Sequence, residues 1–283
     1  TLLYSVYNAY VLASSAKAIQ VAALSGELFI LNTTKTPVGV VPTPNTNYSK
    51  GFFTIEAGQF NMRYQVSLES SSGHVFSAEY ITPNGTGSTD ADLASPETIA
   101  IQLASDLNTI YPAELTASVW KATVYCTLKP FEGVDRVLTV TSSTGGAYVV
   151  TSRTSTVRDS SLLPATLSST ADGYVVAVGS KYPAYYKYEA ASKKWLETGA
   201  PSGGYTGFTS MPISISNVSG WALNSGAYEG RYAGDSDSNP EHAFMKSLTP
   251  LTGMSAYQGR LVLLQGSRVS MSASNNPRRF YRS

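Results

Sequence analysis

The hydrophobic pattern near the end of the chain has the two-residue period of a β-strand. Residues 261–264 form an apolar run, residues 265–267 are turn formers, and residues 269–273 alternate apolar side chains with serines. This pattern predicts a strand, a tight turn and a half-buried second strand with an open edge. Residues 1–12 are also strand-like in composition. We therefore expect both ends of the chain to belong to one sheet system, cut from a longer polypeptide.

Two earlier segments alternate in the same way and predict hairpins. Residues 18–24 and 27–31 lie on either side of a Ser-Gly pair, which suits a two-residue turn. Residues 64–68 and 76–80 alternate around a serine-rich turn. Between these hairpins, residues 32–50 contain three prolines among threonines and asparagines. Because proline fixes φ and lacks a backbone donor, we expect an extended linker there.

One segment has a clear helical period. Ser95 is a suitable N-cap, Pro96 fits the first helical position, and Glu97 lies near the positive end of the helix dipole. Pro112 ends the segment. The apolar stripe of this predicted helix consists of Ile99, Leu103, Leu107 and Ile110.

The elements around the helix predict a separate small domain. Strands are expected at about 116–128, 134–141 and 147–152, which gives the order β, β, α, β, β, β. We therefore predict that residues 51–152 form an inserted α+β domain, with the helix packed on one face of an antiparallel sheet. Residues 1–50 are then N-terminal strands followed by the linker.

Residues 153–283 predict a return to a mainly β fold. The expected elements are a long loop at 153–172, strands at 173–178, 185–188, 194–197 and 211–215, and a Gly-rich loop at 199–207.

Composition points to an assembly protein. Charged residues make up 14% of the chain, against about 25% in an ordinary globular domain. Serine, threonine and 19 tyrosines take their place, and tyrosine suits sheets and interfaces. The net charge of +1 argues against a dedicated nucleic-acid clamp. No apolar run approaches the roughly 18 residues that span a bilayer, so no membrane span is expected.

The one cysteine lies on the apolar side of an alternating segment. Cys126 falls in register with Val124 and Leu128. A reactive thiol would need an accessible, electropositive setting. We therefore expect Cys126 to be a small buried hydrophobic residue.

Asp235, Asp237 and Asn239 have the spacing that opens a calcium-binding loop. Pro240 stands where that loop needs glycine, and Lys246 stands where a bidentate glutamate is needed. We therefore favour a turn held by Asx hydrogen bonds. An ion site is the weaker interpretation.

Other catalytic or metal-binding patterns are weak, so no catalytic, cofactor or metal residue is predicted. His74 and His242 have no partner at metal-ligand spacing. The carboxylates that a glycosidase could use are Glu229, Asp235, Asp237 and Glu241, but their spacing fixes no pair. The chain lacks a Gly-x-Ser-x-Gly elbow and a P-loop.

A basic cluster near the end of the chain consists of Arg268, Arg278, Arg279 and Arg282. It could meet phosphate, or it could protect a sheet edge from pairing with other chains. Each firm phosphate contact adds affinity through counterion release. Between these interpretations, we favour contacts with another subunit or with solvent over contacts with phosphate.

The order of several short segments resembles a known family. The matching segments are the hairpin at 19–32, the helix-bearing insert, Asp172-Gly-Tyr-Val-Val, Tyr185-Tyr-Lys-Tyr-Glu, Lys194-Trp-Leu-Glu-Thr198, Met211-Pro212, Gly234-Asp-Ser-Asp-Ser-Asn-Pro240, Gln258-Gly-Arg-Leu-Val-Leu-Leu-Gln-Gly266 and Ser270-Met-Ser272. In this order they resemble the tail tubular protein B, or nozzle protein, family of short-tailed bacteriophages (podoviruses). The resemblance spans nearly the whole chain but only an N-terminal part of the longer family protein.

This resemblance implies a mainly β chain that is part of a β-propeller-like platform carrying the inserted domain. It implies a structural, non-enzymatic subunit of a hexameric ring in the virion tail, next to the tail adaptor protein. The ring would form the channel for DNA ejection, contact passing DNA without sequence specificity, and dock tail fibres or tailspikes. Because ring building constrains the insert least, we expect residues 51–152 to face outward and serve docking.

A second function class stays open from the sequence. Exposed aromatic side chains could stack on sugars, which would indicate a carbohydrate-binding or glycan-cleaving module. The candidates are Tyr185, Tyr186, Tyr188, Trp195 and Tyr205. Cross-strand aromatic pairs within a sheet would explain the same residues without a ligand.

Overall fold

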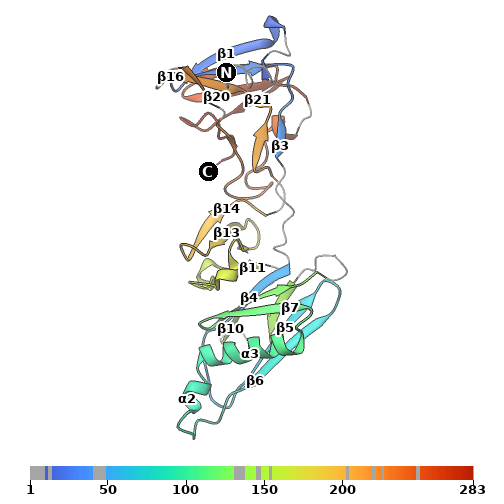
Figure 1. Ribbon diagram of the computed structural model, residues 1–283, viewed down its shortest axis with the longest axis vertical. Helices are drawn as coiled ribbons and strands as arrows, with labels where there is room; N and C mark the ends of the chain where they lie inside the picture. The colour runs from blue at the N-terminus through green and yellow to red at the C-terminus, as the bar shows by residue number, and fades with distance from the viewer. Residues whose placement is uncertain are drawn as a thin grey trace. The chain divides into compact units, whose positions relative to one another are not determined.

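The computed structural model describes residues 10–11, 15–40, 49–130, 138–144, 148–152, 155–201, 204–217, 221–224, 226–246 and 249–282. The chain divides into two compact units: unit 1 comprises residues 1–43 and 202–283, and unit 2 comprises residues 44–201 (Figure 1). Unit 1 is therefore built from the two ends of the chain and unit 2 from its middle. The predicted insert of residues 51–152 lies within unit 2, which continues to residue 201.

The largest sheet of unit 1 joins the N-terminal hairpin to a distant segment. Its strands, in spatial order, are β1 (Ile19–Leu24), β2 (Glu27–Asn32), β16 (Ile213–Asn217) and β17 (Trp221–Asn224), all antiparallel. The hairpin turn has φ values of +53° at Ser25 and +77° at Gly26, as a two-residue turn with left-handed geometry requires. The predicted hairpin is confirmed, and its second strand is an inner strand of the sheet.

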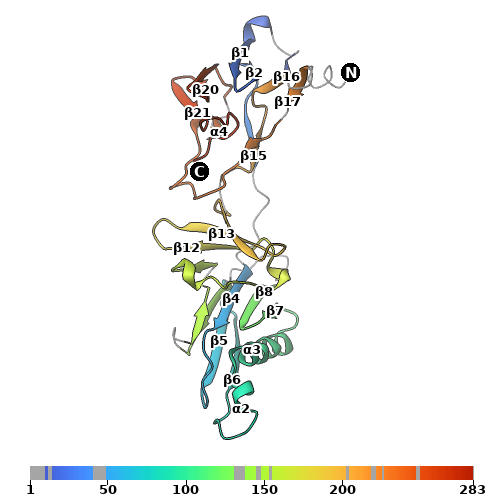
Figure 2. The same ribbon diagram turned by 90° about the vertical axis from the view of Figure 1, so that its left-hand side faces the viewer.

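Two three-stranded antiparallel sheets complete unit 1. One has the order β18 (Tyr228–Glu229), β15 (Gly207–Thr209), β3 (Val38–Val40). The other has the order β19 (Gly253–Tyr257), β20 (Arg260–Gln265), β21 (Arg268–Met271), and Figure 2 shows β20 and β21 side by side. A short helix, α4 (Ala243–Lys246), and the 3-10 helix η1 (Ala16–Ala18) also belong to this unit.

The core of unit 1 is rich in aromatic side chains. The buried residues are Phe29, Leu31, Met211, Tyr228, Phe244, Met245, Leu251, Met254, Leu261, Leu263, Phe280 and Tyr281. They come from β2, β18, α4, β19 and β20, from the segment after β21, and from residues just before β16 and β19. Burying each such side chain contributes roughly 1.5–3 kcal/mol, so this cluster holds the two ends of the chain in one unit.

In unit 2, two sheets and a helix enclose a second core. The first sheet has the order β10 (Val149–Thr151), β4 (Lys50–Ile55), β8 (Thr123–Leu128), β7 (Leu115–Trp120). The second has the order β6 (Val75–Ile81), β5 (Arg63–Ser70), β9 (Leu138–Ser142). The helices are α2 (Asp90–Leu93) and α3 (Pro96–Ile110), and α3 packs against strands of both sheets (Figure 1).

Helix α3 forms where the sequence predicts it. The Ser95 side chain accepts a hydrogen bond from the Thr98 backbone N–H, and Pro96 occupies the first turn. Leu103 and Leu107 are fully buried, whereas Ile110 is 57% exposed. The predicted stripe is therefore right for its first three residues and wrong for the last, because Ile110 lies at the end of the helix.

A third sheet in unit 2 has its own core. Its order is β11 (Thr156–Val157), β12 (Val175–Val178), β13 (Ala184–Glu189), β14 (Lys194–Thr198), and β11 and β12 run parallel. Two 3-10 helices, η3 (Ser160–Leu162) and η4 (Ser169–Ala171), lie in the predicted long loop. The core joins Tyr174 and Tyr188 to Phe52 of β4 and Tyr125 of β8. Residues after 152 therefore share a hydrophobic core with the predicted insert.

Several local predictions are corrected by tertiary pairing. Residues 116–128 form the hairpin β7–β8 instead of one strand, with φ +51° at Lys121 in its turn. Within the predicted linker, residues 38–40 form β3, and its partner β15, residues 207–209, begins at the last residue of the predicted Gly-rich loop. Residues 41–48 of the linker and 134–137 of a predicted strand lie outside the described residues.

At the fold level, the mainly β class is confirmed. The described sheets have three or four strands each and form no closed barrel. The propeller-like platform stays a prediction. At the N-terminus, only residues 10 and 11 of the strand predicted at 1–12 are described, and neither is in a strand. The open edge predicted after Arg260 corresponds to β21, the outer strand of its sheet in the described part of the chain.

Candidate functional site

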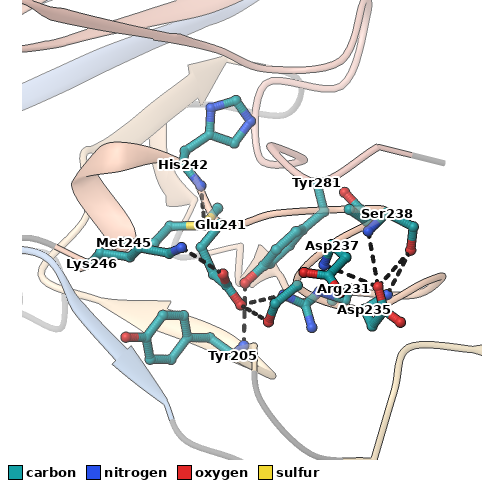
Figure 3. Close-up of polar contacts among 12 residues, drawn as sticks. Tyr205, Arg231, Asp235, Asp237, Ser238, Glu241, His242, Met245, Lys246 and Tyr281 are labelled. Atoms are coloured by element: carbon teal, nitrogen blue, oxygen red, sulfur yellow. Dashed lines mark hydrogen bonds and ion pairs between the residues drawn. The ribbon is translucent and has the colours of Figure 1, made fainter. Parts of the chain in front are cut away.

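Residues 231–246 of unit 1 contain five of the side chains that the sequence singled out, namely Asp235, Asp237, Glu241, His242 and Lys246 (Figure 3). Arg231 and Glu241 form an ion pair, with side chains only 3% and 7% exposed. Lys246 Nζ lies 3.2 Å from the second carboxylate oxygen of Glu241, but the Lys246 side chain is 60% exposed. The charge of Glu241 is therefore balanced by one buried and one solvated cation.

The Arg231 guanidinium is closely packed. Its Cζ lies 5.3 Å from the centroid of the Tyr281 ring, and a Cβ at Gly204 would come within 3.0 Å of it. The Nε and Nη1 groups of Arg231 are buried without a hydrogen-bond partner in the described structure. Since each unsatisfied buried polar group costs about 1–3 kcal/mol, Arg231 depends strongly on Glu241.

Glu241 is held in its ionised form. Burial by itself would raise the pKa of Glu241, but hydrogen bonds and the charges of Lys246 and Arg231 outweigh this and lower the pKa below its ordinary value. A glycosidase general acid needs the opposite shift. The other candidate, Glu229, accepts a hydrogen bond from Asn276 Nδ2 at 2.8 Å and pairs with Arg279. Both carboxylates therefore have structural partners.

The Asp235–Asn239 segment forms the predicted Asx turn. Asp235 Oδ1 accepts hydrogen bonds from the backbone N–H of Asp237 at 3.0 Å and of Ser238 at 2.9 Å, and from Ser238 Oγ at 2.9 Å. In the part of the chain that the structure describes, no group of three or more His, Cys, Asp or Glu residues is placed to hold a metal ion.

The turn fixes the segment that follows β21. Asn239 is 4% exposed. Its amide oxygen accepts from the Arg282 backbone N–H and its amide nitrogen donates to the Arg282 carbonyl, both at 2.9 Å. Three residues later, His242 Nε2 donates to the Phe280 carbonyl at 2.6 Å. Burial lowers the pKa of His242, so the ring is neutral at neutral pH and serves as a support.

His74 belongs to unit 2 and has local partners. Its ring stacks on Phe76 with centroids 4.5 Å apart, and its Nδ1 lies 3.4 Å from Glu114 Oε2. In the same unit, Cys126 is fully buried, and burial raises the pKa of its thiol to about 12. The prediction that Cys126 behaves as a small buried hydrophobic residue is confirmed.

The predicted arginine cluster separates into two kinds. Arg278 donates to Glu27 Oε2 and to Ser214 Oγ, both at 2.6 Å, and Arg279 pairs with Glu229 at 3.7 Å. These two arginines form ion pairs inside unit 1, and their contact with another subunit stays a prediction. Arg268 and Arg282 are exposed.

Comparison with known protein families shows what kind of protein carries this site. Residues 4–283 match a family model described as bacteriophage nozzle protein. The chain belongs to the bacteriophage nozzle protein family. As a nozzle-family protein it is a structural component of the phage tail and is located in the virion. No curated protein matches the chain. None of the helices in the described part of this nozzle-family chain has the length and apolarity needed to cross a bilayer.

Most aromatic candidates for sugar stacking are used inside the nozzle-family fold. Tyr188 and Trp195 are opposite each other on β13 and β14, with ring centroids 5.3 Å apart. The Tyr188 hydroxyl donates to the Leu167 carbonyl at 3.0 Å, and Trp195 Nε1 donates to the Pro164 carbonyl at 2.8 Å. Tyr205 packs on Phe208 in unit 1. The cross-strand explanation is therefore confirmed for Tyr188 and Trp195.

Sequence reasoning missed the partners that organise this site. Arg231 was not singled out, and neither was Glu27, which lies 251 residues from Arg278. A lone arginine in a polar segment has no local signal of burial. Glu27 directly follows a turn, where charged residues are ordinarily solvated. The pairing of β2 with β16 brings Glu27 close to Ser214, and Arg278, from the segment after β21, donates to both.

Proposed function

We propose that this chain is a subunit of a homo-oligomeric, hexameric ring in the phage tail nozzle, where it lines the channel for DNA ejection and docks the tail adaptor protein and the tail fibres or tailspikes. The observation that carries the proposal is the nozzle-family match over residues 4–283. The mainly β fold with separate compact units is compatible with a building block of this kind.

The chemistry of unit 1 supports a structural role without catalysis. Its buried charges are used in internal pairs, Arg231 with Glu241 and Arg278 with Glu27. Asp235 is used in a turn. Groups held in this way stabilise a rigid scaffold, whereas a hydrolase needs two carboxylates with separated pKa values facing a substrate.

The charge of the chain supports a channel that contacts DNA without sequence specificity. The net charge is +1, and Arg278 and Arg279 are already neutralised by carboxylates of unit 1. Because each new phosphate contact adds salt-dependent affinity, a wall with few free cations lets DNA pass with little retention.

Electron microscopy of the purified chain with adaptor protein tests the proposal. We expect six-fold rings that stack on the adaptor. A chain that stays monomeric at high concentration and never binds adaptor would contradict it. Glycan arrays and a reducing-sugar assay on the same preparation test the non-catalytic role, and sugar release that is lost on Glu241→Gln would overturn it.

A deletion tests whether the middle of the chain serves docking. Phe52 and Tyr125 share a core with Tyr174 and Tyr188, so removing only residues 51–152 would cut through that core. We therefore delete residues 44–201, the whole of unit 2, and join the ends with a Gly/Ser linker. Ring assembly should persist while fibre attachment is lost. Loss of both would refute the modular role of unit 2.

A further inference from the structure

An open groove of about 680 Å³ lies in unit 1 between β21 and the segment that follows it. Three arginines line it, Arg260, Arg279 and Arg282, together with His242. The described residues that line it include no Asp or Glu. Burial keeps His242 neutral at neutral pH, and Arg279 is paired with Glu229. The positive charge of the lining therefore comes from Arg260 and Arg282.

The cations of the groove have spare hydrogen-bonding capacity. Arg260 donates through Nη1 to the Ser272 carbonyl at 2.7 Å, and the ion pairs of the described residues give neither Arg260 nor Arg282 a carboxylate. Arg279 Nε is buried without a hydrogen bond, and Glu229 Oε2 is 3.7 Å away. Guanidinium groups in this state favour a carboxylate or phosphate ligand.

The backbone of the groove is fixed before any ligand arrives. Asn239 holds Arg282 through both backbone groups, and His242 holds the Phe280 carbonyl. On the opposite side, Ala273 pairs with Asn276 in a β-bridge, and its N–H donates to the Arg279 carbonyl at 2.6 Å. Binding therefore needs little ordering of the backbone, which lowers its entropic cost.

Apolar side chains continue from the groove along the sheet edge. Met271, which lines the groove, is 42% exposed, and Val269 on the same face of β21 is 58% exposed. Val269 pairs across the sheet with Leu264, which is 36% exposed. β21 has one strand neighbour, β20, in the described part of the chain. An exposed strand edge with apolar side chains fits an added peptide strand. A DNA backbone, which is charged, would gain nothing from contact with apolar side chains.

We propose that this edge and groove bind an extended acidic segment of a partner protein. The segment adds to the edge of β21 that has no strand neighbour in the described part of the chain. It places apolar side chains on Val269 and Met271 and directs a carboxylate to Arg260 and Arg282. This inference rests on the proposed docking function and gives the chemistry of one docking partner. Edge protection explains an exposed arginine on β21 such as Arg268, but it does not explain three arginines around one groove.

Fluorescence anisotropy on the full chain tests the proposal with a labelled peptide that alternates valine and glutamate. We expect saturable binding that the double variant Arg260→Gln/Arg282→Gln weakens by about tenfold or more, since hydrogen bonds to charged groups are the strong ones. A peptide with glutamine in place of glutamate should lose the same affinity. The control Arg158→Gln/Lys194→Gln removes two exposed charges of unit 2 and should leave binding unchanged.

Three results would overturn the proposal. One is absent or arginine-independent binding of the peptide. Another is a DNA duplex that binds more tightly than the peptide with the same dependence on the arginines, which would make the groove a phosphate site. The third is self-association in sedimentation that the arginine substitutions abolish, because a second copy would then occupy the groove. Ring assembly is measured separately, so failure here is distinguishable from failure of the proposed ring.

Discussion

The Arg231–Glu241 pair gives the sharpest prediction for unit 1. Glu241→Gln keeps the shape of the side chain and removes its charge, which leaves Arg231 buried at 3% exposure without a counter-ion. Removing one partner of a buried ion pair costs about 3–5 kcal/mol. The Nε and Nη1 groups of Arg231 have no hydrogen-bond partner in the described structure. Besides Glu241, Nη2 bonds only to the neutral Ser236 hydroxyl among the described residues, so no second carboxylate there replaces Glu241. We therefore expect unit 1 to lose about 3 kcal/mol of unfolding free energy.

Hydrogen exchange with peptide-level mass spectrometry measures this loss unit by unit. Since 1.4 kcal/mol corresponds to a factor of ten, the most protected amides of β20 should exchange about 100-fold faster in Glu241→Gln. The amides of α3 in unit 2 should be unchanged. Lys246→Gln is the matched control, because it removes the solvated partner of the same carboxylate and should cost less than about 1 kcal/mol.

A double variant separates charge from packing. Arg231→Met with Glu241→Gln removes both buried charges, so it should be more stable than Glu241→Gln, as replacing a buried pair with apolar side chains is often neutral. The reasoning is refuted if Glu241→Gln costs no more than Lys246→Gln. It is also refuted if the double variant is less stable than Glu241→Gln alone.

Three further predictions concern pH, the helix and the thiol. The pKa of Glu241 is lower in the folded chain than its ordinary value of 4.5, so its contribution to stability is complete above pH 4.5 and is lost as the pH falls below that value. Between pH 6 and 3, the thermal stability of unit 1 should therefore fall more steeply in the wild type than in Glu241→Gln. Equal slopes would contradict this. Ser95→Ala removes the N-cap of α3 and should lower the free energy of unfolding, measured in urea, by about 1 kcal/mol. Ser95→Asp keeps a capping side chain and should be neutral, and an equal loss in both variants would show that the cap is not the cause. Burial raises the pKa of the Cys126 thiol to about 12. A thiol reagent at pH 8 should therefore label Cys126 only at the rate at which unit 2 unfolds locally. Labelling as fast as that of a free thiol would disprove its burial.

The sequence determined the elements whose signals are local. The hairpin around Ser25 and Gly26 follows from a two-residue turn between apolar segments, and α3 follows from its cap at Ser95 and its period. The burial of Cys126 follows from the alternation of its strand. In each case, neighbours within a few residues carry the physical cause, so the pattern is sufficient.

Tertiary structure alone decided the features that join distant residues. β3 has few local strand signals and exists through its pairing with β15. Arg278 is an ordinary surface residue by sequence, yet the β2–β16 pairing gives it Glu27 and Ser214 as partners. Arg231 is buried because Tyr281 and Glu241 enclose it. A buried charge needs a partner whose distance along the chain has no fixed spacing, and for that reason no sequence period reveals it.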